Sequence, residues 1–147
     1  RCNVASLITK AKGQLNMTTY IIYQRTNVDS DRINAMPTST YAKAYFALGM
    51  PSRDTVEDAV SDGLFHNMYQ PTMIMQDTED RDRTPFEAIF DEGNGYGDGS
   101  IKTANIRDRC SMSVGDILVQ IDTGYSHICM PVGWHSVNLT LELTTAA

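Results

Sequence analysis

Short apolar runs separated by turn residues dominate the chain. Residues 19–24 are rich in Tyr and Ile, residues 117–121 form a nearly continuous apolar run, and apolar and polar residues alternate over 137–143. Aromatic and β-branched residues in such runs favour extended backbone. The pattern predicts strands at 19–24, 72–76, 117–121, 125–130 and 137–143, the last with one wet face.

Three other segments have apolar residues at helical spacing. The most distinctive begins Thr84-Pro85-Phe86-Glu87. That order predicts a capping threonine, a proline at the first helical position and a capping-box glutamate. Because glycine ends helices, the pattern predicts helices between Ser39 and Gly49, between Ser52 and Gly63, and between Thr84 and Gly93.

The expected order of elements, β-α-α-β-α-β-β-β, is typical of the α+β class. We expect a mainly antiparallel sheet with about three short helices packed on it. No repeat or linker divides residues 17–147, so they are expected to form a single domain. Residues 1–16 precede Met17 and carry basic residues but no acidic ones. We interpret them as a leader, a read-through or a vector-derived extension, and we leave them out of the fold.

Composition and charge exclude several classes of function. The chain of 147 residues carries a net charge of −6, and its basic first 16 residues leave −9 for the remainder. This balance disfavours binding to nucleic acid or to an anionic membrane surface. No apolar run has the length of a spanning helix. Only Cys110 and Cys129 lie beyond the first 16 residues, and they form no disulfide framework, so a reducing cytoplasm is expected.

The last third of the chain resembles a known family. Residues 84–94 carry spaced aromatic residues and end in Asn94, residues 109–118 read Arg-Cys-Ser-Met-Ser-Val-Gly-Asp-Ile-Leu, and a Tyr-bearing strand leads to Val-Gly-Trp at 132–134. This arrangement is similar to the YodL-like module of phage and conjugative-element proteins, over residues 84–137. Cys110 departs from the family pattern. It stands between Arg109 and Ser111, so the basic residue lies one position earlier than in the family. The resemblance implies an accessory protein of a mobile element that acts inside a bacterial host.

The residues of this motif also have a structural interpretation. Ser113 and Asp116 can bond to backbone donors in a turn, and Gly115 can supply a positive φ angle. Val114, Ile117 and Val119 are then expected to enter the core.

No motif in the sequence indicates a cofactor or a metal. His127 and Cys129 would share one face of a strand, and with His135 they could form a zinc site. We interpret them instead as a partly buried histidine beside a small thiol. The segment Asp91–Gly99 resembles a calcium loop but lacks ligands at two required positions. It also lacks the lysine of a phosphate loop. We therefore expect neither a metal nor a cofactor.

The sequence offers candidate binding residues more readily than catalytic ones. Glycines at 93, 95, 97 and 99 surround Tyr96 and Asp98, and we interpret this segment as a mobile connection or a binding loop. Glu87 and Asp91 are helical neighbours whose like charges could raise the pKa of one of them, although a solvated helix face also accounts for them. No catalytic residue is assigned. The candidate binding residues are Tyr96, Asp98, Trp134, Asn138 and Glu142.

These features predict a small phage or mobile-element protein that binds a host protein in the bacterial cytoplasm, as a counter-defence factor. Two alternatives stay open. One is a compact enzyme acting on a nucleotide-like host metabolite, and the other is a structural component of a virion. A homo-oligomer is compatible with all three, because a strand at 137–143 would leave a sheet edge open to a second copy.

Overall fold

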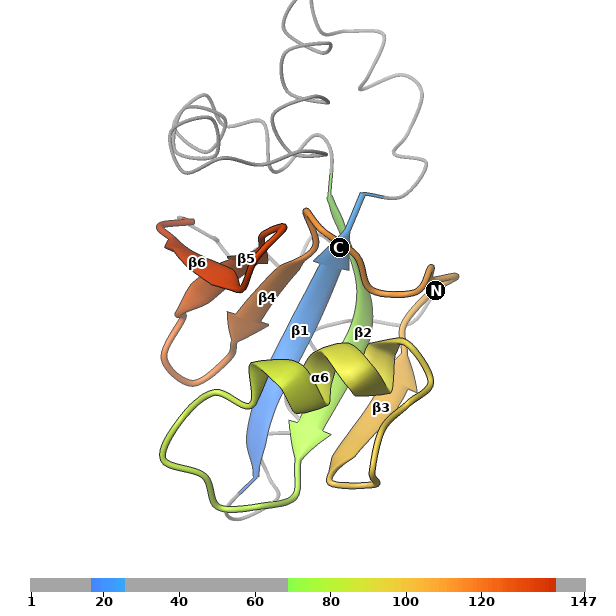
Figure 1. Cartoon of the computed structure of the whole chain (residues 1–147), viewed down its shortest axis with the longest axis vertical. Helices are drawn as coiled ribbons and strands as arrows, with labels where there is room; N and C mark the ends of the chain where they lie inside the picture. Colours follow the sequence, from blue (N-terminus) through green and yellow to red (C-terminus); the bar gives the residue numbers. More distant parts are fainter. Residues whose placement is uncertain (1–16, 26–68, 140–147) are drawn as a thin grey trace, which may run out of the picture.

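The computed structural model describes residues 17–25 and 69–139. These residues form six strands and one helix, and every pair of neighbouring strands is antiparallel. The order across the sheet is β3-β2-β1-β4-β5-β6 (Figure 1). In chain order the elements are β1 (Thr18–Gln24), β2 (Gln70–Asp77), α6 (Phe86–Gly93), β3 (Ile101–Asn105), β4 (Ile117–Gln120), β5 (Ser126–Cys129) and β6 (Trp134–Val137).

The predicted antiparallel sheet is confirmed. The described residues do not contain the expected number of about three helices. The described ranges contain the helix α6 alone. The helices expected between Ser39 and Gly49 and between Ser52 and Gly63 lie outside the described residues. Within the same ranges, no helix has the length and apolar character needed to cross a membrane.

Strand β1 lies at the centre of the sheet, between β2 and β4. It pairs regularly with β2 from Thr18 to Ile22, and the register then shifts so that Tyr23 faces Pro71. Proline lacks the N–H that a ladder uses, and inside a sheet it is found at such irregularities. The shift therefore accommodates Pro71 in a strand that has neighbours on both sides.

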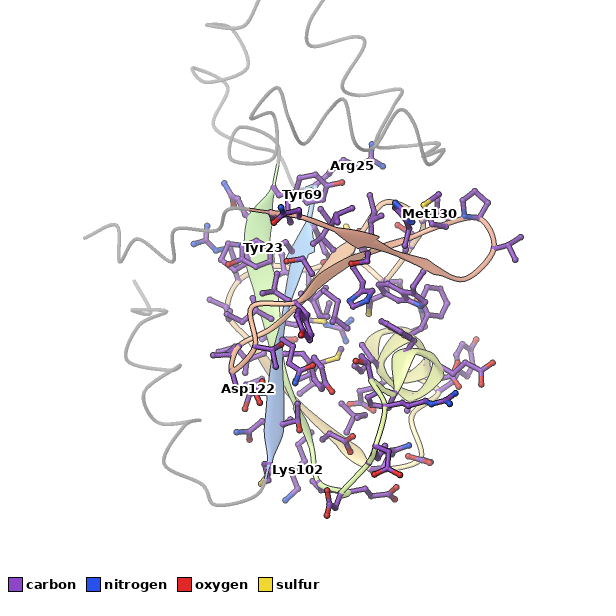
Figure 2. The ribbon with its side chains drawn as sticks, turned by 90° about the vertical axis from the view of Figure 1, so that its left-hand side faces the viewer. Tyr23, Arg25, Tyr69, Lys102, Asp122 and Met130 are labelled. Atoms are coloured by element: carbon purple, nitrogen blue, oxygen red, sulfur yellow. The ribbon has the colours of Figure 1, made fainter. Side chains whose placement is uncertain are left out.

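Both faces of the central strands of the sheet are buried. On one face, α6 lies across β1 and β2, and side chains fill the space between helix and sheet (Figures 1 and 2). This cluster is centred on Tyr20, Ile22, Met73, Met75, Ile89 and Leu118, with Phe86, Phe90 and Trp134 packed at its margin. The opposite face carries Ile21, Ile74, Ile117, Val119 and Ile128, all nearly inaccessible to solvent. Burial on two sides explains why β1 and β4 read as continuous apolar runs.

The helix α6 begins without the predicted cap. Its N-cap residue is Pro85, and no side chain caps the first turn. The Thr84 side chain hydrogen-bonds the Tyr20 hydroxyl instead, and Glu87 is exposed. The capping-box interpretation is therefore wrong, because the threonine joins the helix entrance to the sheet.

Two predictions about strands also need correction. Strand β3 was not expected, since in Ile-Lys-Thr-Ala-Asn only Ile101 is buried. The last strand within the described residues runs over Trp134–Val137. Of the strand expected over 137–143, residues 138 and 139 lie outside any strand, and residues 140–143 fall beyond the described part of the chain. Asn138 follows β6 as an exposed residue. Glu142 lies outside the described residues.

Gly93, at the end of α6, is required by close packing. A Cβ atom built on this residue would overlap the Met112 side chain, and both residues are buried. Helix α6 can therefore lie against the segment before β4 only because position 93 has no side chain.

We expect Gly93→Ala to destabilise the protein by about 1–3 kcal/mol, the usual cost of overpacking a core. Urea unfolding of both proteins measures the change. The double variant Gly93→Ala/Met112→Ala should lose less than the sum of the two single changes, because the second substitution removes the overlapping atoms. Strict additivity would contradict this account of Gly93.

Candidate functional site

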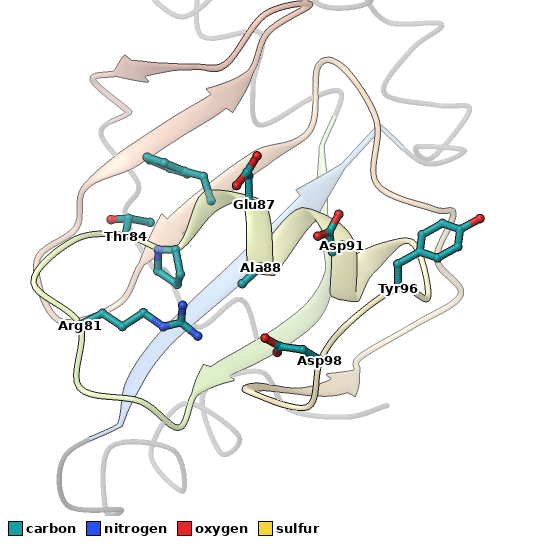
Figure 3. Close-up of a pocket in the computed structure, with 9 residues that line it drawn as sticks. Arg81, Thr84, Glu87, Ala88, Asp91, Tyr96 and Asp98 are labelled. Atoms are coloured by element: carbon teal, nitrogen blue, oxygen red, sulfur yellow. The ribbon is translucent and has the colours of Figure 1, made fainter.

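A groove runs beside α6 on the outer side of the helix (Figure 3). Its volume is about 530 Å³, and it is bounded by the loop before α6, the helix itself and the glycine-rich loop after it. The lining includes three carboxylates, one guanidinium and two aromatic rings, from Arg81, Phe86, Glu87, Asp91, Tyr96 and Asp98.

The groove is acidic. Glu87 and Asp91 lie one turn apart on α6 and both are exposed, and Asp98 joins them from the following loop. The side-chain and backbone hydrogen bonds from Ser100 lower the pKa of Asp98, so its carboxylate stays ionised at neutral pH. The carboxylates outnumber the one cation in the lining, Arg81, so the groove attracts positive charge.

The glycine-rich loop has a defined hydrogen-bonded shape. Gly95 and Gly99 adopt φ angles of 83° and 90°, which side chains with a Cβ atom avoid. A Cβ atom at Gly97 would overlap the Glu92 carboxylate. Between these glycines, the Tyr96 N–H donates to the Asp91 carbonyl at 2.8 Å. The Tyr96 side chain is 81% exposed, so the loop presents this ring to solvent.

Arg81 fixes the base of the same loop. Its Nε lies 3.0 Å from Oδ2 of the buried Asp77, at the end of β2. Its Nη2 donates to Ser100 Oγ at 2.7 Å. The Ser100 N–H in turn donates to Asp98 Oδ1 at 2.9 Å. Arg81 therefore connects the sheet to the residue that holds Asp98, and it positions the groove as well as lining it.

The four sequence-predicted binding residues that the structure describes fall in two places. Tyr96 and Asp98 lie together in the groove. Trp134 is half-buried on β6 and stacks on Phe86, with ring centroids 5.1 Å apart and planes 17° apart. Asn138 is exposed beyond β6, on a different element. Phe86 lines the groove as well, so its ring connects Trp134 to the groove without bringing the two sites together.

Sequence reasoning missed Arg81 and did not connect Asp91 with Tyr96. Arg81 belongs to a run of seven charged or polar residues, 77–83, that indicated only a solvated loop. The helical spacing of Glu87 and Asp91 was visible in the sequence. Their position opposite Asp98 was not, because it depends on how the glycine-rich loop folds back along α6.

His127 and His135 do not lie on one face. In the pairing of β5 with β6, His127 is opposite Ser136 and His135 is opposite Ile128. Paired residues share a face and successive residues alternate between faces, so the two imidazole rings lie on opposite faces of the sheet. Within the part of the chain that the structure describes, no three His, Cys, Asp or Glu side chains are grouped closely enough for a metal ion.

His127 packs in an aromatic environment. Its ring meets Phe86 edge-on, with centroids 4.9 Å apart. Burial, and then the charge of His135, lowers the pKa of His127. The neighbouring thiol on this face, Cys129, has its pKa raised to about 11 by burial and by Asp116. Both groups are therefore uncharged at neutral pH, as expected for structural side chains.

The motif residues form the predicted turn. The Ser113 N–H donates to Asp116 Oδ2 at 2.9 Å, the Asp116 N–H donates to the Ser113 carbonyl at 3.1 Å, and Gly115 has a φ angle of 94°. Val114 is half-buried, while Ile117 and Val119 are buried. The predicted turn and the burial of Ile117 and Val119 are confirmed, whereas Val114 was expected in the core and is only half-buried.

A buried amide that the sequence did not reveal holds this turn. Gln24, at the end of β1, donates from Nε2 to Asp116 Oδ2 at 2.9 Å and to the Cys110 carbonyl at 3.1 Å. Its Oε1 accepts from Thr72 Oγ1 at 3.0 Å. Burial raises the pKa of Asp116 to about 6, against the lowering effect of the hydrogen bonds from Gln24 and Ser113.

Comparisons with protein-family models, with curated proteins and with solved structures give no match to this chain. The likeness of residues 84–137 to the YodL-like module therefore rests on the quoted residues alone.

We expect Arg81→Ala to destabilise the protein by about 2–4 kcal/mol, because it leaves the buried Asp77 carboxylate without its cation. Thermal and urea unfolding measure the loss. Asp77→Asn/Arg81→Ala should recover a large part of it, and Arg83→Ala, a neighbouring exposed arginine, should have little effect. Equal losses for Arg81→Ala and Arg83→Ala would show that the pair contributes nothing.

The raised pKa of Asp116 predicts a pH dependence of stability. Because the folded-state pKa is about 6 and the unfolded value is about 3.9, the folded chain binds this proton more tightly. Its contribution therefore stabilises the fold at low pH and is lost as the pH rises through 6.

We accordingly expect Asp116→Asn, which keeps an oxygen acceptor, to unfold with a free energy about 2–3 kcal/mol higher than wild type above pH 7. The advantage should shrink toward pH 4. Urea unfolding across this pH range measures both, with Asp122→Asn at an exposed turn as the control. A variant less stable than wild type at neutral pH would contradict the prediction.

Proposed function

We propose that this protein is an accessory protein of a phage or other mobile element that acts in the host cytoplasm by binding a host protein, as a counter-defence factor. The groove beside α6 is the contact surface in this proposal, and a basic segment of the host protein is the ligand. The resemblance of residues 84–137 to the YodL-like module supports the mobile-element context. We also propose that the domain as a whole belongs to the α+β class with about three short helices. In this proposal two of the helices precede Gly63.

One observation supports the location of the binding site. The fully ionised Asp98 and the exposed Tyr96 lie in the same groove as Glu87 and Asp91. A lysine or arginine side chain fits such a groove, because its charge can pair with carboxylates while its cation or alkyl stem packs on an aromatic face. Exposed tyrosines are also frequent anchors of protein interfaces.

The charge of the groove favours a protein ligand over nucleic acid. Phosphate backbones are held by clustered lysine and arginine side chains. Here Arg81 is already bonded to Asp77 and Ser100, and it also pairs with Glu79 at 3.1 Å. The groove therefore offers its anionic groups to a ligand, which is the arrangement that a basic protein segment recognises.

The chain contains a matched control for this site. Tyr96 and Tyr125 are both exposed tyrosines, at 81% and 66%, but Tyr125 lies in the turn between β4 and β5 and does not line the groove. We expect Tyr96→Ala to reduce capture of the host protein from a bacterial lysate by about tenfold or more, as for an interface anchor. Tyr125→Ala should capture it as wild type does. Quantitative mass spectrometry of the captured protein measures the difference.

Two further results test the chemistry of the contact. Asp98→Asn should weaken capture, and high salt should weaken it further because the ion pairs are exposed. Equal capture by Tyr96→Ala and Tyr125→Ala would remove the groove from the proposal. A co-purified small molecule with no protein partner would favour the compact-enzyme alternative.

A further inference from the structure

Among the described residues, strand β3 forms one edge of the sheet (Figure 1). Its pairing with β2 is continued at both ends by backbone bonds, from the Thr78 N–H to the Ser100 carbonyl at 3.0 Å and from the Ile106 N–H to the Thr72 carbonyl at 2.9 Å. Bonded and non-bonded pairs alternate along antiparallel strands. The even-numbered residues of β3 are therefore the ones that bond to β2.

The odd-numbered residues of β3 direct their backbone groups away from β2. These are Ile101, Thr103 and Asn105, and each offers one N–H and one C=O to the outside of the sheet. The neighbouring Lys102 and Ala104 are exposed, as is Asn105 itself. Solvent therefore reaches this edge in the folded chain.

The edge has few of the features that usually prevent strand addition. The register between β3 and β2 is continuous, without a bulge, and β3 contains no proline and one charged residue, Lys102. A regular edge of this kind binds extended peptides through its main chain, while side-chain positions on the two faces select the sequence.

Charge indicates what kind of strand would fit. On the α6 side of β3, Thr103 Oγ1 donates to Glu92 Oε1 at 3.1 Å. Asp98 and Tyr96 precede β3 on the same side, in the loop that lines the groove. Because side chains alternate between the faces of a strand, every second residue of an added strand would point toward these carboxylates.

We propose that the edge of β3 receives an extended segment of the partner protein by strand addition, with lysine or arginine at every second position directed toward Glu92 and Asp98. This inference rests on the proposed function, since it gives the basic partner of the groove a conformation and a main-chain binding site. The specificity lies in the groove, and the main-chain bonds lie on Thr103 and Asn105.

A synthetic nine-residue peptide of alternating lysine and valine, blocked at both ends, is the probe. Residue-resolved amide hydrogen exchange of the full chain should show the outward amides of Thr103 and Asn105 protected by about tenfold or more on addition of the peptide. The amides of Lys102 and Ala104, already bonded to β2, should change little. The same peptide N-methylated at alternate residues should bind more weakly, because it lacks the donors.

Asn105 offers a matched pair of variants. Asn105→Pro removes an outward N–H and leaves the bonds between β3 and β2, so it is tolerated at an edge. Asn105→Ala keeps the N–H. We expect Asn105→Pro to bind the peptide about tenfold more weakly than Asn105→Ala, a difference of about 1.4 kcal/mol, with both variants folded as judged by circular dichroism.

The outcomes separate this inference from the proposed function. If Asp98→Asn weakens binding of the peptide while Thr103 and Asn105 gain no protection, strand addition is wrong and the acidic groove remains. If the N-methylated peptide binds equally well, strand addition is also wrong. If the outward amides are protected without peptide and the protection rises with protein concentration, a second copy of this chain occupies the edge, and the inference is overturned. If the peptide does not bind at all, strand addition is wrong, and the comparison of host-protein capture by Tyr96→Ala and Tyr125→Ala decides the proposed function separately.

Discussion

The buried side chain of Gln24 determines how the second half of the molecule lies on the sheet. It bonds to β2 through Thr72 and to the segment before β4 through the Cys110 carbonyl and the Asp116 carboxylate. A buried amide that loses such partners costs about 1–3 kcal/mol for each unmet group, so these bonds fix the position of segment 110–116. That segment carries Met112, which packs on the end of α6 and sets where the glycine-rich loop begins.

Two separate sets of contacts therefore determine the shape of the groove. Gln24 places the end of α6 from one side, and the Arg81–Asp77 pair holds the base of the loop from the other. Between them, glycines at 95 and 99 turn the backbone so that Tyr96 and Asp98 face outward. Such a surface is fixed by the scaffold before any ligand arrives, which reduces the entropy lost on binding.

Most strands of the sheet could be predicted from the pattern of apolar residues along the chain. Strands with strong apolar runs, such as β1 and β4, were predicted because burial on both faces demands apolar residues throughout. Strand β3 was missed because an edge strand needs only one buried residue, Ile101. Thr84 was assigned to a helix cap because local sequence cannot reveal that its partner is Tyr20, more than sixty residues away. Tyr96 and Asp98 could be proposed as binding residues from their place in the glycine-rich segment, but Arg81 and Gln24 act through distant contacts that the sequence does not encode locally.

The stacking of Phe86 on Trp134 gives the groove an optical consequence. Trp134 is the only tryptophan in the chain, and Phe86 both stacks on it and lines the groove. A ligand that displaces the Phe86 ring would alter the surroundings of the indole, and with them the wavelength and intensity of its emission. The protein therefore contains an intrinsic fluorescent reporter next to its candidate binding surface, so occupancy of the groove can be followed without a label.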